Sequence, residues 1–136
     1  GQEVQPGLAG PFAGVHNDVL IVAGGANFPG DPPWRGGAKV WYDDIHVLEK
    51  TGADQSTWRT GFKLARPLAY GASVTTDEGV LCIGGCDSER CYSEVFFLRW
   101  NSQARQIETE QLAPLPKPCA FGYAARIKDT VYLMKK

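Results

Sequence analysis

The segment "VLIVAGGANF", residues 19–28, runs from four apolar residues through Ala23 into a glycine doublet and a polar loop. Glycine doublets after apolar strands occur both in phosphate-binding loops and at strand ends of repeated β units. A phosphate loop needs a helix behind its glycines, so that backbone N–H groups and the helix dipole meet the anion. No helical periodicity follows this doublet, and the pattern G-x-G-x-x-G is absent. We therefore interpret Gly24-Gly25 as a strand end that requires positive φ or close backbone approach.

The same pattern recurs along the chain, which indicates an internal repeat. The stretch "GASVTTDEGVLCIGG", residues 71–85, matches "GVHNDVLIVAGG", residues 14–25, in its acidic turn, its apolar run and its terminal doublet. The doublets Gly24-Gly25 and Gly84-Gly85 lie 60 residues apart, and a third copy begins at Gly122, 51 residues after Gly71. A period of about 50 residues is typical of kelch-type propeller blades, which have four strands each.

The repeat predicts an all-β fold with about two and a half four-stranded blades and one partial β-propeller domain over residues 1–136. The blades are expected at about 11–64, 70–112 and, for the half blade, 121–134. Their strands are listed here in order: 11–16, 18–24, 41–49 and 57–64; 70–76, 79–84, 93–100 and 106–112; 121–127 and 130–134. Known propellers have 4–8 blades, so we expect the chain to belong to a longer protein or to complete a ring by association. Open blade edges would favour self-association.

Composition excludes some partners. Lys and Arg number 14 and Asp and Glu number 15, for a net charge of −1, which gives no global attraction to nucleic acid or to an anionic membrane. No apolar run approaches the roughly 20 residues that cross a bilayer, and no signal peptide is visible before the first doublet. The start at Gly1, without Met, gives a slight preference for a processed periplasmic protein.

The four cysteines do not have the paired spacing of a structural zinc site, and no metal-ligand cluster is evident. Cys82 lies in an apolar run and is expected in the core. Cys86 and Cys91 either stay reduced or form a disulfide in an oxidising compartment.

Strand topology sorts the candidate site residues. Antiparallel strands place the turns between first and second strands at one end of each blade. The loops after the doublets and the links between blades lie at the other end. The first such loop, 26–41, is long and rich in Pro and Gly, and long loops on a rigid scaffold often carry function. The candidate binding residues at this end are Asn27, Phe28, Trp34, Arg35, Lys39, Arg66 and Tyr70. Guanidinium groups match carboxylates, and aromatic faces pack on sugar C–H surface, so the set suits an acidic sugar.

Other notable residues have structural interpretations. His16 and His46 are expected to be structural or exposed, and Asp43-Asp44 to shape the entry to a strand. Trp58 is expected to pack between blades. Glu89-Arg90 is either a solvated surface pair or part of the site.

Four segments carry a resemblance to a known family: "GPFAGVHNDVLIVAGGANFP", "KVWYDDIHVL", "RPLAYGAS" and "VLCIGGCDSERCYSEVF". They resemble the N-acetylneuraminate epimerases, or sialic acid mutarotases, over about residues 10–134. The segment "KPCAFGYAARIKDTVYLM" directly follows the two blades, an order that resembles the cyclically permuted branch of this family.

The resemblance implies a six-bladed propeller that interconverts the α and β anomers of N-acetylneuraminate without a cofactor. A carboxylate would shuttle the proton and an arginine would hold the sugar carboxylate. The family's Glu and Arg lie in a blade upstream of the two matched here. The nearest look-alike, Glu89-Arg90, belongs to a different blade and is taken as a surrogate for the catalytic pair.

Two other functions compete with the enzyme: a kelch module that captures a protein partner through its loops, and an inactive truncated product. A large apolar patch on the loop end would favour the interaction module. The absence of a third doublet at 135–136, where the chain has Lys135-Lys136, favours the truncated product.

Overall fold

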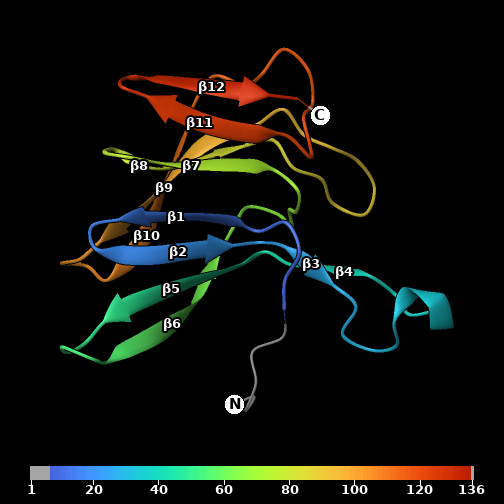
Figure 1. The fold of residues 1–136 in the computed structure, drawn as a ribbon, viewed down its shortest axis with the longest axis horizontal. Helices are drawn as coiled ribbons and strands as arrows, with labels where there is room; N and C mark the ends of the chain where they lie inside the picture. Colours follow the sequence, from blue (N-terminus) through green and yellow to red (C-terminus); the bar gives the residue numbers. More distant parts are fainter. Residues whose placement is uncertain (1–6, 136) are drawn as a thin grey trace.

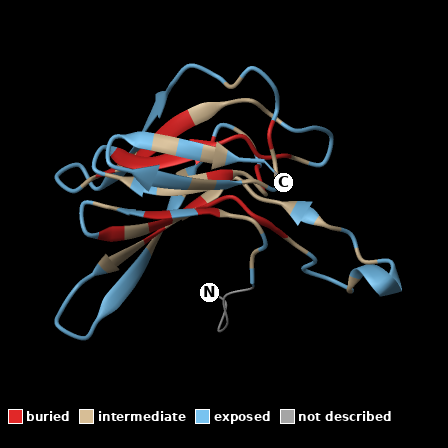
Figure 2. Ribbon diagram, turned by 45° about the horizontal axis from the view of Figure 1, so that its top comes forward, coloured by how far each residue is buried: buried red, intermediate tan, exposed pale blue. Residues whose placement is uncertain are grey.

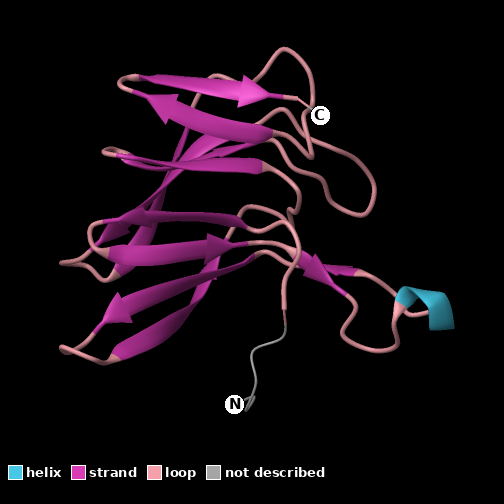
Figure 3. Ribbon diagram, in the orientation of Figure 1, coloured by secondary structure: helices cyan, strands magenta, loops and turns pink. Residues whose placement is uncertain are grey.

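The computed structural model describes residues 7–135, which form two four-stranded antiparallel sheets and two two-stranded ones. The first sheet has the order β1 (Phe12–His16), β2 (Val19–Ala23), β5 (Asp44–Lys50) and β6 (Ser56–Lys63). The second has the order β7 (Ala72–Thr76), β8 (Gly79–Ile83), β9 (Val95–Asn101) and β10 (Gln106–Gln111). The half blade is β11 (Tyr123–Ile127) and β12 (Thr130–Met134). These sheets stack face to face as blades, which confirms the all-β, kelch-type propeller fold (Figures 1 and 3).

The loop after the first doublet has structure of its own. Strands β3 (Ala26–Asn27) and β4 (Val40–Trp41) pair as a short ribbon, and the 3₁₀ turn η1 (Pro33–Arg35) lies at the tip. The prediction of a third strand over 41–49 is wrong at its start, because Trp41 pairs with Ala26 in the ribbon and β5 begins only at Asp44. The ribbon therefore extends the loop end of the blade.

The main core lies between blades one and two. Side chains of alternate residues on β2 and β5 are buried, as period-two alternation requires when one sheet face is covered. They meet the facing side of blade two, and Phe12 contacts Phe96 edge to face with ring centroids 5.6 Å apart. Cys82 is a free, fully buried member of this cluster, which confirms its expected place in the core. Figure 2 shows the buried residues gathered in the strands that face one another.

A second, smaller core joins blade two to the half blade. Ala72, Leu81, Ile83 and Phe97 are its buried members, and side chains of β11 and β12 pack against them. Both cores therefore form by the same face-to-face stacking of neighbouring sheets.

Three backbone hydrogen bonds fix the start of each new blade to the doublet of the preceding one. The Gly25 N–H donates to the Leu68 carbonyl at 2.8 Å, the Leu68 N–H to the Tyr42 carbonyl at 3.2 Å, and the Tyr42 N–H to the Gly25 carbonyl at 2.9 Å. We call this set the glycine triangle. Leu68 lies in the link between β6 and β7, so the triangle ties the link to blade one.

The triangle repeats at the next blade. Gly85 donates to the Cys119 carbonyl at 2.9 Å, Cys119 to Tyr92 at 3.1 Å, and Tyr92 to Gly85 at 2.8 Å. The first glycine of each doublet makes room for the link carbonyl. A Cβ on Gly24 would lie 2.3 Å from the Leu68 oxygen, and one on Gly84 would lie 2.2 Å from the Cys119 oxygen. Both glycines also have positive φ. The doublets are therefore strand ends that require positive φ and close backbone approach, as the sequence predicts.

The opposite end of the blades has a different inter-blade contact. His16 Nδ1 accepts a hydrogen bond from the Trp100 N–H at 2.9 Å, and Asn17 Nδ2 donates to the Trp100 carbonyl at 2.7 Å. The turn of blade one thus binds both backbone groups of Trp100, and His16 has the structural role expected. Burial and the nearby Arg99 charge lower the pKa of His16.

The outer face of blade one carries no other blade within the described residues. Trp58 is 50% exposed there and lies edge to face with His46, beside a hollow of about 120 Å³ that Leu8, Val22 and Thr60 also line. The expectation that Trp58 packs between blades is therefore not met in this chain, because strand alternation turns Trp58 away from blade two. Among residues 7–135, no helix combines the length and apolar character needed to cross a bilayer.

Replacing Gly24 by Ala tests the close approach at the doublet. At Gly36, where φ is also positive but nothing lies within 4 Å of an added Cβ, we expect Ala to cost about 1–2 kcal/mol of unfolding free energy from backbone strain alone. Gly24→Ala should cost about 2 kcal/mol more, because the Leu68 carbonyl must move. Urea unfolding of both variants measures the difference. Equal losses would show that the carbonyl contact is unimportant.

Acid should weaken the His16 contact. The folded-state pKa of His16 is below its ordinary value of 6.5, so the unfolded chain takes up this proton first as the pH falls. The stabilisation from neutral His16 is fully present above about pH 6.5 and is lost as the pH falls to the folded-state pKa. Urea unfolding at pH 7.5 and 5.5 should show this loss in wild type and less of it in His16→Gln. His46→Gln, on the outer face, should keep the wild-type dependence of stability on pH. If the loss of stability at pH 5.5 is reduced in His46→Gln and not in His16→Gln, the assignment to His16 is refuted.

Candidate functional site

Loops 26–41 and 86–93 lie at the same end of the molecule, together with the links between blades (Figure 1). The hairpin turns β1–β2, β7–β8 and β11–β12 lie at the other end (Figure 1). The two loops share a shallow hollow of about 440 Å³, lined by Lys39, Val40, Trp41, Pro67, Asp87, Ser88 and Glu89. The topology expected from the sequence, with both loops on one rim, is confirmed by this hollow.

The loop of blade two is closed by a disulfide between Cys86 and Cys91, the alternative that the sequence left open. Inside it, Asp87 Oδ1 accepts hydrogen bonds from the backbone N–H groups of Glu89 at 2.8 Å and Arg90 at 2.9 Å. Asp87 Oδ2 accepts a hydrogen bond from the Tyr92 hydroxyl. These hydrogen bonds lower the pKa of Asp87 to about 2, and the bond from the Tyr92 hydroxyl has the largest effect. Asp87 is therefore a fixed anion that orders the loop, and it is a poor proton carrier.

Glu89 lies at the tip of this loop, exposed and without an ion-pair partner within the described part of the chain. It lines the hollow, whereas Arg90 does not. Of the two surrogate residues, Glu89 has the free carboxylate that a proton shuttle needs.

Two tyrosines that the sequence pattern does not single out are also part of the rim. The Tyr42 hydroxyl donates to Asn27 Oδ1 at 2.8 Å, and the Tyr92 hydroxyl bonds Asp87 in the same way. Asn27 and Asp87 each come two residues after a doublet, and each tyrosine belongs to a glycine triangle. The repeat alignment carries the signal for Asn27 and Asp87, because both follow their doublet at the same spacing.

The cations expected at the site differ in how they are engaged. Arg66 forms an ion pair with Glu94, and its guanidinium lies 4.5 Å from the Tyr92 ring centroid. The Arg90 guanidinium lies 5.0 Å from the same centroid. Lys39 Nζ lies 4.3 Å from the Tyr70 ring centroid and 5.0 Å from that of Trp41. Lys39 is thus the cation placed in the hollow beside aromatic rings.

The remaining candidate residues lie around the hollow or away from it. Tyr70 stacks on Phe121 with centroids 4.7 Å apart and an interplanar angle of 24°. Asn27 Nδ2 also donates to the Gly7 carbonyl at 3.1 Å. Phe28 is 36% exposed, and Trp34, on the projecting η1 turn with Arg35, is 82% exposed (Figure 1). Of the candidate binding residues, Lys39 lines the hollow. The others do not, and their role in binding stays a prediction: Asn27, Phe28, Trp34, Arg35, Arg66 and Tyr70.

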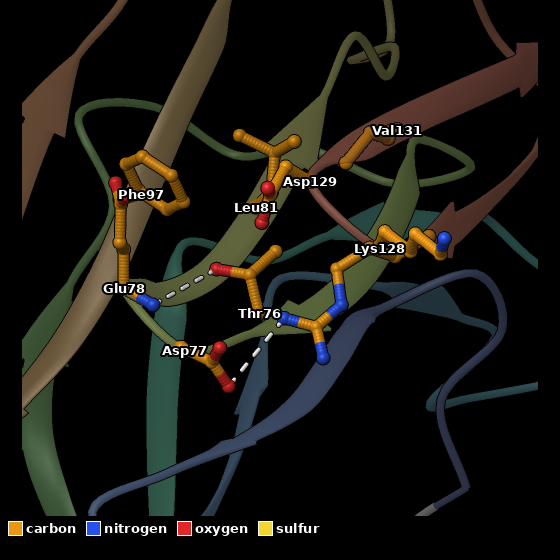
Figure 4. Close-up of a pocket in the computed structure, with 9 residues that line it drawn as sticks. Thr76, Asp77, Glu78, Leu81, Phe97, Lys128, Asp129 and Val131 are labelled. Carbon is orange, nitrogen blue, oxygen red and sulfur yellow. Dashed lines mark hydrogen bonds and ion pairs between the residues drawn. The ribbon is translucent and has the colours of Figure 1, made fainter.

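A second hollow, of about 290 Å³, lies at the opposite end between blade two and the half blade (Figure 4). Asp77 forms an ion pair with Arg126 at 3.5 Å, and the apolar side chains of Leu81, Phe97 and Val131 also line the hollow. Leu81 and Phe97 belong to the second inter-blade core, so this hollow is the open end of a blade seam. We therefore place the candidate site at the loop end. No group of three or more metal-ligating side chains occurs in the part of the chain that the structure describes.

Comparison with known proteins identifies the family. The family model of N-acetylneuraminate epimerase matches residues 1–107, which include both complete doublets and the loops that line the hollow. The chain belongs to the N-acetylneuraminate epimerase family. Epimerases of this family from Brucella melitensis biotype 1 and Vibrio cholerae serotype O1 are 39% and 40% identical to it over 118 and 114 residues.

These epimerases are much longer than the chain. The alignments cover 79% and 76% of the chain but only 29% and 28% of the two relatives. A solved structure titled "Structure of YjhT" superposes with a TM-score of 0.65 and 27% identity, over 80% of this chain and 32% of that one. The chain thus spans about three tenths of the epimerases that it matches.

The hydrogen bonds around Asp87 make a prediction for its titration. In Tyr92→Phe the largest contribution is removed, so the pKa of Asp87 should rise from about 2 toward its ordinary value of 3.8. Carboxyl ¹³C chemical shifts followed from pH 1.5 to pH 6 measure it. Tyr42→Phe is the matched control, because Tyr42 bonds Asn27 instead. An unchanged Asp87 pKa in Tyr92→Phe would contradict the geometry.

Proposed function

We propose that the chain forms part of a sialic acid mutarotase, which interconverts the α and β anomers of N-acetylneuraminate. The observation that carries the proposal is the shared hollow of a chain in this family: it brings a free carboxylate, Glu89, and an ammonium group, Lys39, to one rim. A carboxylate can move protons, and an ammonium group can bind the acid group of the sugar.

Glu89 is the residue to which we assign proton transfer. In its protonated form it would give a proton to the ring oxygen. Its carboxylate, or a water molecule, would take the proton of the anomeric hydroxyl as the ring C–O bond breaks and the carbonyl forms. In the open-chain sugar, rotation about the bond between the carbonyl carbon and the next chain carbon turns the other face of the carbonyl toward the hydroxyl. The reverse proton transfers then close the ring as the other anomer. No atom is gained or lost and no electron leaves the sugar, so the proposed reaction requires no redox cofactor.

Asp87 is unsuited to this role although it lines the same hollow. Its two oxygens already accept three hydrogen bonds, and its pKa of about 2 keeps it ionised. Asp87 and the Cys86–Cys91 disulfide would instead hold the loop that carries Glu89. The disulfide also supports a place in an oxidising compartment such as the periplasm.

The complete enzyme would be a six-bladed ring, of which this chain supplies two blades and half of a third. Large apolar side chains are exposed on the outer faces of blade one and of the half blade: Val15, Trp58, Tyr123, Ile127, Tyr132 and Met134. These faces continue the stacking direction of the existing blades, so they fit further blades, from a longer chain or from association. These six side chains lie on the faces where further blades would stack, as ring completion requires.

The test is the rate of anomer exchange after a sialidase releases α-N-acetylneuraminate, followed by ¹H NMR. Glu89→Gln should slow the catalysed exchange by roughly 10²–10⁴-fold, the usual contribution of general acid–base catalysis. Glu78→Gln, at the opposite end of blade two, is the control and should keep the wild-type rate. Exchange by wild type no faster than in buffer would refute the proposed function.

A further inference from the structure

Lys39 is held in the hollow by aromatic rings rather than by a carboxylate. Its ammonium lies 4.3 Å from the Tyr70 centroid and 5.0 Å from the Trp41 centroid, and the side chain is half-buried. The ion pairs among residues 7–135 do not include Lys39. Ring faces attract the cation but use none of its three N–H donors as a carboxylate would. The charge therefore remains available to an anionic ligand.

A second donor beside Lys39 also has no acceptor. The indole Nε1–H of Trp41 is buried and has no hydrogen-bond partner in the described part of the chain. A buried donor without an acceptor is destabilising. Trp41 is fixed in place by the pairing of β4 with β3 and lines the same hollow. Lys39 and Trp41 thus bring two donors without an acceptor to the residues that line the hollow.

The ring of Tyr70, which contacts Lys39, stacks on that of Phe121, and both residues adopt a left-handed backbone that non-glycine residues disfavour. Tyr70 and Phe121 stack, and both have positive φ, 66° and 58°. Each occupies the same position in its link. The Phe121 N–H donates to the Tyr70 carbonyl at 2.8 Å, and the Tyr70 N–H donates to the Gly10 carbonyl at 2.8 Å. Left-handed backbone at non-glycine residues is costly, and such strain is concentrated at functional sites. Phe121 is 55% exposed, and its ring packs on Tyr70. Tyr70 thus lies between Phe121 and the Lys39 ammonium.

The arginines are less suited to the same ligand. Arg66 is paired with Glu94, so a ligand carboxylate would have to displace that ion pair. Arg90 does not line the hollow, and Arg35 is on the projecting turn. The sequence predicts that a guanidinium group holds the sugar carboxylate. In the structure, the unpaired cation that lines the hollow is instead the ammonium group of Lys39.

We infer that Lys39 and the Trp41 indole N–H bind the carboxylate of an acidic sugar, with the Tyr70 ring holding the Lys39 ammonium in place. This inference deepens the proposed function and rests on it for the class of sugar. It makes Lys39 the residue that distinguishes an acidic sugar from its neutral counterpart.

The test measures binding separately from anomer exchange. The methyl α-glycoside of N-acetylneuraminate cannot open its ring, and its methyl ester lacks the negative charge. NMR titration of the ¹⁵N-labelled chain should show that wild type binds the acid roughly ten-fold more tightly than the ester, because the ester lacks the charge that Lys39 binds. Lys39→Met should abolish this preference, and Lys39→Arg should restore most of it. Trp41→Phe, which keeps an aromatic ring, should reduce it in part.

Controls separate the subsite from the fold and from the reaction. Lys50→Met, which removes an exposed lysine at the end of β5, should keep the preference, and unchanged thermal midpoints would show that each variant is folded. Equal binding of acid and ester by wild type, or no binding of either, would overturn the inference, whereas anomer exchange by the same sample would still support the proposed function. Preference for the acid that depends on Lys39, without anomer exchange, would support the inference and overturn the mutarotase activity.

Discussion

The hydrogen bond from the second glycine of each doublet to the carbonyl of the next link is the constraint on which the rest of the structure depends. It closes the glycine triangle at Gly25 and again at Gly85, and so sets where each following blade begins. The first glycine is equally necessary, because a side chain there would collide with the same carbonyl. With the links fixed in this way, the loops after both doublets open on one rim. The candidate site is thus a consequence of how the blades are joined.

The two repeats use one geometry for different chemistry. Each places a polar residue two positions after the doublet and bonds it to the tyrosine of the triangle. Blade one has the amide of Asn27 there, followed by a long loop that carries Lys39 and Trp41. Blade two has the carboxylate of Asp87, whose loop is short and closed by a disulfide. A rigid repeated base therefore supports one projecting loop that contributes a cation and one compact loop that contributes Glu89.

Features that recur with the period could be predicted from the sequence, and features that depend on one particular contact could not. The doublets, the alternation of β2 and β5, and the rim shared by loops 26–41 and 86–93 all follow from the repeat. The pairing of Trp41 with Ala26 could not be predicted, because two-residue strands have no periodicity to detect. Nor could the ion pair of Arg66 with Glu94, which joins residues far apart in the sequence. Trp58 was assigned to a blade interface by its position in the repeat, but this chain has no described blade on that face.

The most direct test of the central claim is the scalar coupling across the hydrogen bonds from Gly25 and Gly85 to the link carbonyls, measured by NMR on the ¹⁵N,¹³C-labelled chain. Cross-peaks from the Gly25 amide nitrogen to the Leu68 carbonyl carbon, and from Gly85 to Cys119, are expected, with slow hydrogen exchange at both glycine amides. Missing cross-peaks together with exchange as fast as in the exposed loop tips would contradict the account, because nothing would then hold the two loops on one rim.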